Sequence, residues 1–168
     1  PAGALLASHV AVLIAERLGV AHTPVRVEVF PEIPRASGLG ASAALAVAVI
    51  RAMAHHFTLT VTNEEISRLA FECEELVHGT PSGIDNTVAT FGRTILFQKE
   101  ATGNSILELS IARPIPVVVG MTGVRSLTAD TVGRVHAGWE KNPRHYDAIF
   151  TEIDDLVMTG VAALARGD

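Results

Sequence analysis

The chain has 168 residues, of which 48% are hydrophobic and 18% are charged, and this composition excludes a disordered protein. The formal net charge of −5 and the lack of a basic cluster argue against nucleic acid as the main partner. The longest apolar or small run, residues 38–50, is too short to cross a bilayer, so we expect a globular protein with a small-molecule partner.

The first half of the chain predicts a helix, a strand and a second helix. Residues 5–18 carry apolar side chains on every turn, which predicts a helix that stops at Gly19. Residues 25–30, VRVEVF, alternate between apolar and polar, which is typical of a half-buried strand. Residues 41–57 are apolar on all sides through Ile50, which predicts a buried helix at the centre of the core.

A third helix is predicted from a capping box, with Thr62 as N-cap and Glu65 reaching back to it. Six residues then repeat at helical spacing and form its expected apolar stripe: Ile66, Leu69, Ala70, Cys73, Leu76 and Val77. Gly79 and Pro81 end this helix, and Ser82 can cap a short helix through about Thr90.

The second half predicts three strands followed by two helices. The strands are expected over residues 93–98, 106–111 and 115–119, and the helices over 128–141 and 146–166. A composition shift at residues 112–114 is the best candidate for a domain boundary. The chain starts without methionine, so we expect it to be a piece of a longer protein.

The single cysteine, Cys73, cannot form an internal disulfide, which makes a cytosolic location the default expectation. It falls on the apolar stripe of the third helix. A buried structural cysteine is therefore favoured over a catalytic thiol.

The segment PRASGLGASAA, residues 34–44, joins the predicted strand to the buried helix. A glycine-rich turn before a helix presents backbone N–H groups and a partial positive charge to an anion. Ser42 could add a hydroxyl for a phosphate-bound Mg²⁺. The alternative is a tight turn in which Ser42 caps the helix, and the residues alone do not decide between the two.

A second constellation comprises Glu74, His78 and Asp85. Periodicity places Glu75 away from the apolar stripe but does not separate Glu74 from Glu72, and either could be an ordinary boundary carboxylate. Asp85 alone could be a helix N-terminal carboxylate favoured by the dipole.

The glycine segment resembles the second signature motif of the GHMP kinases, P-x-x-x-G-L-G-S-S-A-A. Ala41 replaces the first serine, and Ser42 retains the second. A second match is Glu74 to Asn86, E-x-x-x-H-G-x-P-S-G-x-D-N. This segment resembles the corresponding segment of the mevalonate kinase branch, whereas galactokinases and homoserine kinases have different sequences in this region. Residues 122–128, TGVRSLT, are similar to the segment that enters the family's second domain.

The resemblance implies roles for individual residues. Asp85 and Thr128 would be catalytic, Ser42 and Glu74 would bind Mg²⁺, and His78, Ser82, Asp85 and Thr128 would lie at the substrate. The residues expected at the ATP phosphates are Pro34, Arg35, Ala36, Ser37, Gly38, Leu39, Gly40, Ala41 and Ser42. Three of the residues expected at the substrate also have simpler possible roles. His78 could donate a hydrogen bond at a helix C-terminus, Ser82 could cap a helix, and Thr128 could be an N-cap.

The implied fold is α+β, with a mixed-sheet N-terminal domain of the ribosomal protein S5 domain 2-like type carrying the phosphate loop. It would occupy residues 1–112, and residues 113–168 would begin a ferredoxin-like C-terminal domain. The implied activity is ATP- and Mg²⁺-dependent phosphorylation of the 5-hydroxyl of mevalonate in isoprenoid precursor synthesis.

The family's first motif, which supplies a lysine, and its third, a glycine-rich loop, are not found in these residues. We therefore expect the chain alone to be inactive. Alternatives are a kinase for phosphomevalonate, a sugar or another alcohol, a mevalonate-diphosphate decarboxylase, or a non-catalytic ligand-binding homologue. The expected partners are ATP and a small alcohol, with neither nucleic acid nor a membrane, and a homodimer remains open.

Overall fold

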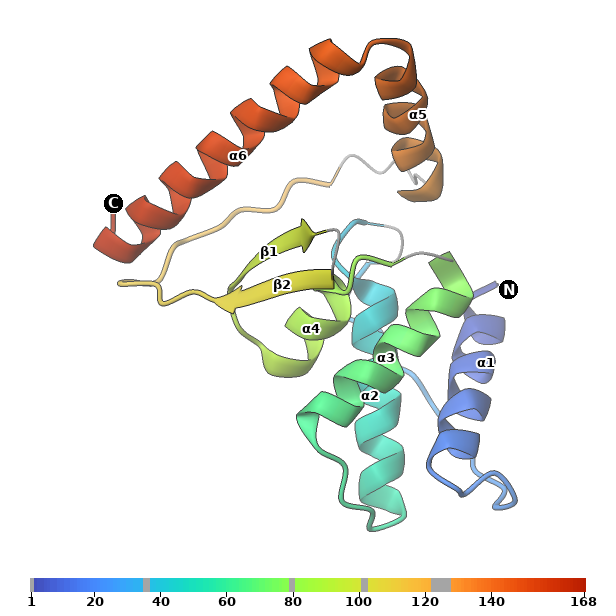
Figure 1. Cartoon of the computed structure of the whole chain (residues 1–168). Helices are drawn as coiled ribbons and strands as arrows, with labels where there is room; N and C mark the ends of the chain where they lie inside the picture. The colour runs from blue at the N-terminus through green and yellow to red at the C-terminus, as the bar shows by residue number, and fades with distance from the viewer. Residues whose placement is uncertain (1, 35–36, 79–80, 101–102, 122–127) are drawn as a thin grey trace. The chain divides into compact units, whose positions relative to one another are not determined.

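The structure, a computed structural model, describes residues 2–34, 37–78, 81–100, 103–121 and 128–168 (Figure 1). Its contacts group into two compact units, Pro1–Gly92 and Arg93–Asp168. The predicted domain boundary near residue 112 lies later in the chain than this division and stays a prediction. In the part of the chain that is described, no helix has both the length and the apolar character needed to span a membrane.

The first unit contains four helices, α1 (Ala2–Arg17), α2 (Ala41–His56), α3 (Asn63–His78) and α4 (Ile84–Phe91). Helix α2 contacts the other three, as predicted for the centre of the core (Figure 1). The core is formed by apolar residues of α1, α2 and α3: Val10, Ile14, Ala46, Val47, Val49, Ile50, Met53, Ile66, Leu69, Ala70 and Cys73.

Helix α3 begins with the predicted capping box. The Thr62 N–H donates to Oε2 of Glu65 at 2.8 Å, and the Glu65 N–H donates to Oγ1 of Thr62 at 3.2 Å. The apolar stripe is buried as far as Cys73, but Leu76 is 68% exposed, so the prediction was wrong at that residue. Leu76 is not among the core residues, which on α3 are Ile66, Leu69, Ala70 and Cys73.

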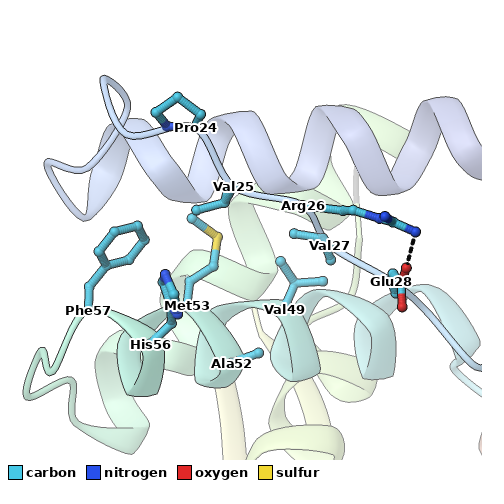
Figure 2. A pocket seen from close by; sticks show the side chains of 10 residues that line it. All are labelled: Pro24, Val25, Arg26, Val27, Glu28, Val49, Ala52, Met53, His56 and Phe57. Carbon is cyan, nitrogen blue, oxygen red and sulfur yellow. Dashed lines mark ion pairs between the residues drawn. The ribbon is translucent and has the colours of Figure 1, made fainter.

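The predicted strand at residues 25–30 is extended but is not part of a sheet. A strand is held by hydrogen bonds to a neighbour, and among the described residues only β1 and β2 pair with each other. Side chains of α2, among them Val49 and Met53, point toward this segment and line a pocket of about 390 Å³ with it (Figure 2). Arg26 and Glu28, both from this segment, form an ion pair at the edge of the pocket.

The second unit contains the antiparallel strands β1 (Ile95–Glu100) and β2 (Gly103–Glu108), followed by α5 (Thr128–Lys141) and α6 (Pro143–Arg166). Both predicted strands exist with shifted bounds, and the register pairs Ile95 with Glu108 and Phe97 with Ile106. The prediction of a third strand at 115–119 was wrong. That segment is extended and exposed, and no strand pairs with it in the described part of the chain.

The two C-terminal helices match the prediction closely. Helix α5 has the expected bounds, whereas α6 begins at Pro143 instead of residue 146. Proline is favoured in the first helical turn because its missing N–H would have no partner there. The side chain of Trp139 on α5 donates through Nε1 to Oδ1 of Asp147 on α6 at 2.9 Å, which ties the two helices together.

Cys73 is a buried structural cysteine, as predicted, with 1% of its surface exposed. Burial raises the pKa of its thiol from 9.0 to about 11, and the nearby carboxylates of Glu72 and Glu74 add to this shift. The thiolate, which is the reactive form, is therefore suppressed in the folded protein.

We predict that Cys73 reacts slowly with a disulfide reagent at pH 8. The raised pKa leaves about 100-fold less thiolate than in an unfolded chain, and burial slows the reaction further. The measurement is the rate of thiol labelling with and without denaturant. Equal labelling rates with and without denaturant would contradict the burial of Cys73.

The same shift affects stability. Because the pKa of the folded protein is raised, the contribution of this thiol to stability is complete below pH 9.0 and is lost as the pH rises toward about 11.

Candidate active site

The glycine segment forms a sharp turn into α2. Gly38 and Gly40 have φ values of +74° and +63°, in the left-handed region that favours glycine. The hydroxyl of Ser37, just before Gly38, donates to the carbonyl oxygen of Pro34 at 2.6 Å. The Ala44 N–H donates to the carbonyl oxygen of Gly40 at 3.0 Å, so the helix starts immediately after the second glycine.

The start of α2 has the features of an anion site. Its N-cap is Gly40, which has no side chain, and the first turn contains no acidic residue. The first N–H groups of any helix lack partners within the helix and carry its partial positive charge. Backbone atoms can therefore approach an anion here without steric hindrance from a side chain at the cap.

Three predicted phosphate-loop residues flank the cap. Ser42 lies half-buried in the first turn of α2, and Ala41 is the first residue of the helix. Since Gly40 is the N-cap, the alternative in which Ser42 serves as the cap does not apply. Leu39 is 43% exposed between the two glycines. Arg35 and Ala36 lie outside the described residues.

The structure brings Asp85 to the same place. A Cβ atom built on Gly40 would lie 3.5 Å from Cγ and 3.6 Å from Oδ1 of Asp85. The carboxylate thus lies in van der Waals range of the position that a Cβ atom of residue 40 would occupy, although 45 positions separate the two residues in the sequence. Asp85 is exposed and sits in the first turn of α4, where the helix dipole favours a negative charge.

The turn before α4 is shaped by Ser82 and Gly83. The Ile84 N–H donates to Oγ of Ser82 at 3.2 Å, which is the cap-like role that the sequence left open for this serine. Gly83 is the N-cap with φ +90°, and a Cβ atom there would lie 3.7 Å from the ring of Phe71. His78 is the last residue of α3.

The three neighbouring glutamates of α3 have different surroundings, which periodicity alone could not establish. Glu74 is buried, with 4% of its surface exposed, whereas Glu75 is exposed to solvent as predicted. Glu72 forms ion pairs with Arg17 at 2.9 Å and Arg68 at 2.5 Å. Glu72 thus joins α3 to α1, and Glu74 is the carboxylate that lies inside the helical unit.

One buried residue beside Asp85 received no role in the sequence analysis. Asn86 has 5% of its surface exposed, and its Nδ2 donates to both the carbonyl oxygen and Oγ of Ser67, each at 3.0 Å. Its place next to the candidate aspartate was the available signal. Its partner on α3 could not be identified from spacing, because the contact depends on how the two helices pack.

Thr128 is the first residue of α5 and belongs to the second unit. Residues 122–127 of the matching motif, including Arg125, lie outside the described residues. A place for Thr128 beside Asp85 therefore stays a prediction.

Comparison with known proteins identifies the family. The model of the GHMP kinases N terminal domain matches residues 5–93, which is more than half of the chain. A mevalonate kinase of Thermococcus sibiricus is 38% identical over 133 residues, which cover 79% of this chain and 38% of that protein. A mevalonate kinase of Arabidopsis thaliana is 32% identical over 161 residues, which cover 89% of this chain and 42% of that protein.

A solved structure is similar over nearly the whole chain. The crystal structure of L. major mevalonate kinase in complex with R-mevalonate matches with a TM-score of 0.77 and 26% identity, covering 97% of this chain and 51% of that one. The chain thus spans about two fifths of the length of its curated relatives. The predicted α+β fold of GHMP kinase type is confirmed, and the family match over residues 5–93 shows that the chain belongs to the GHMP kinase family.

Proposed function

We propose that the complete protein transfers the γ-phosphoryl group of ATP to the 5-hydroxyl of mevalonate. The observation that carries this proposal is the approach of the Asp85 carboxylate to Gly40 at the start of α2. A proton acceptor beside an anion-binding helix start is the arrangement that phosphoryl transfer to an alcohol needs. The names of the similar proteins support mevalonate as the alcohol.

The phosphate loop would supply positioning and electrostatic stabilisation. The backbone N–H groups at the start of α2 would bind phosphate oxygens, and the partial positive charge of the helix would offset the charge on the transferred group. Glycine at positions 38 and 40 keeps side chains away from the phosphates. Ala41, where the family pattern has serine, contributes no hydroxyl to these contacts.

The two proposed metal ligands, Glu74 and Ser42, carry the kind of oxygen atom that Mg²⁺ prefers. The buried carboxylate of Glu74 and the hydroxyl of Ser42 are hard oxygen donors. The described residues contain no cluster of three or more His, Cys, Asp or Glu side chains that could hold a metal. Mg²⁺ needs no such cluster, because it commonly takes one or two protein oxygens together with phosphates and water. When bound, it would neutralise phosphate charge.

Asp85 would act on the alcohol. Its exposed carboxylate can accept the proton of the attacking hydroxyl, and the turn at Ser82 and Gly83 holds the first turn of α4 in place. Thr128 and His78 remain proposed substrate contacts. A cytosolic location and a homodimer stay predictions from the sequence.

We propose further that the chain needs the rest of the protein for activity. The only lysines are Lys99 and Lys141, and both belong to the second unit. Neither lies in a sequence context like that of the family's lysine motif, so we propose that residues outside this sequence supply the lysine expected beside the catalytic aspartate.

The variant Asp85→Asn of the complete protein tests the catalytic role of this carboxylate. We expect the turnover of mevalonate with MgATP, followed by coupled detection of ADP, to fall by about 10²- to 10⁴-fold because the amide cannot accept the proton. The circular dichroism spectrum should not change, since Asp85 is exposed. Turnover at the wild-type rate in this variant would contradict the mechanism.

A panel of alcohols in the same assay tests the substrate. Activity on another alcohol without activity on mevalonate would indicate a different GHMP kinase. Absence of turnover on every alcohol, with ATP still bound, would favour a non-catalytic ligand-binding protein.

Two adjacent glutamates, Glu74 and Glu75, allow a matched test of the metal ligand. Glu74→Gln should raise the Mg²⁺ concentration for half-maximal ATP binding by about tenfold, because a charged oxygen ligand is lost. Glu75→Gln changes the same charge on the exposed face of α3 and should leave that concentration within about twofold of the wild-type value. Calorimetric titration of ATP at graded Mg²⁺ measures both. Equal effects of the two substitutions would rule out Glu74 as the ligand.

A further inference from the structure

The first turn of α4 is attached to α3 by one buried side chain. Asn86 donates through Nδ2 to two oxygens of Ser67, its carbonyl oxygen and Oγ, both at 3.0 Å. With 5% of its surface exposed, the amide has little access to water, so losing these bonds would leave a buried polar group unsatisfied. The attachment therefore fixes both the position and the rotation of this turn.

Helix α4 depends on such contacts because it has only eight residues. A helix of this length is not stable by itself in water. Its N-cap, Gly83, has no side chain, and the hydrogen bond from the Ile84 N–H to Oγ of Ser82 lies within the same turn and does not attach it to another helix. At the other end, Nη2 of Arg51 donates to the carbonyl oxygen of Thr90 at 2.8 Å. Each end of the helix therefore has its own hydrogen-bonded anchor.

Asn86 and Asp85 are consecutive residues with opposite environments. Successive side chains of a helix point about 100° apart, so the buried amide and the exposed carboxylate leave the turn in different directions. The hydrogen bonds of Asn86 to Ser67 on α3 keep this turn in the orientation in which the Asp85 carboxylate lies beside Gly40. A rotation or shift of the turn that breaks the Asn86 bonds must also move the carboxylate.

We propose that Asn86 is a positioning residue for the phosphoryl transfer, which it supports by holding the first turn of α4 on Ser67 so that Asp85 stays beside the phosphate loop. This inference rests on the proposed function. It adds that the rate depends on a buried amide that touches neither ATP nor the alcohol.

The test uses three variants of the complete protein. Asn86→Ala removes both bonds and should lower kcat by about 10- to 100-fold, because a displacement of about 1 Å at a reacting group has that effect. The KM for ATP should stay within about twofold, since the phosphate loop itself is unchanged. Ser67→Ala removes one acceptor and keeps the carbonyl oxygen, so it should lower kcat by a smaller factor.

Arg51→Met is the matched control. It removes the anchor at the other end of α4, five residues from Asp85, together with the hydrogen bond from Arg51 Nη2 to Oδ1 of Asn63 at 3.2 Å, and keeps much of the apolar stem of the side chain. It should lower the urea concentration at half-unfolding but leave kcat within about twofold of the wild-type value.

The outcomes separate the inference from the function on which it rests. A wild-type protein without turnover would overturn both. An active wild type with unchanged kcat in Asn86→Ala would overturn only the positioning role, as would equal loss of kcat in Asn86→Ala and Arg51→Met. If Asn86→Ala does not fold, Ser67→Ala decides, and an unchanged kcat in that variant would overturn the proposal.

Discussion

The close approach of the Asp85 carboxylate to the backbone of Gly40 is the constraint on which the account of this site depends. It joins the starts of two helices, α2 and α4, and a methyl group at position 40 would fill the space between them in van der Waals contact with Asp85. The helical packing around α2 maintains it, since α3 and α4 both contact that helix and each other. Stability and the proposed chemistry thus depend on the same helix contacts.

The helices of the first unit could be predicted well because their signals are local. The capping box of Thr62 and Glu65 forms as expected, and the glycine segment does precede a central buried helix. The burial of Cys73 also followed from its place on the apolar stripe. Each of these features depends on residues within a few turns of one another.

Features that depend on distant partners were predicted less well. Alternation at residues 25–30 and the apolar run at 115–119 indicate a preference for extended backbone, and both segments are extended, but a strand also needs a neighbour to pair with. Likewise, Glu74 and Glu72 could not be separated by periodicity. In the structure Glu74 is buried, whereas Glu72 forms ion pairs with Arg17 and Arg68.

The most direct test of the central claim compares alanine at the two glycines of the loop. Gly38 and Gly40 have similar left-handed φ values, so both substitutions introduce similar backbone strain. Only at position 40 would the methyl group occupy the space between the loop and the Asp85 carboxylate, in van der Waals contact with Cγ of Asp85; at position 38 it meets no described atom within 4 Å. We predict that kcat for mevalonate phosphorylation falls by about tenfold more in Gly40→Ala than in Gly38→Ala. Equal losses would contradict a site shared by the loop and Asp85.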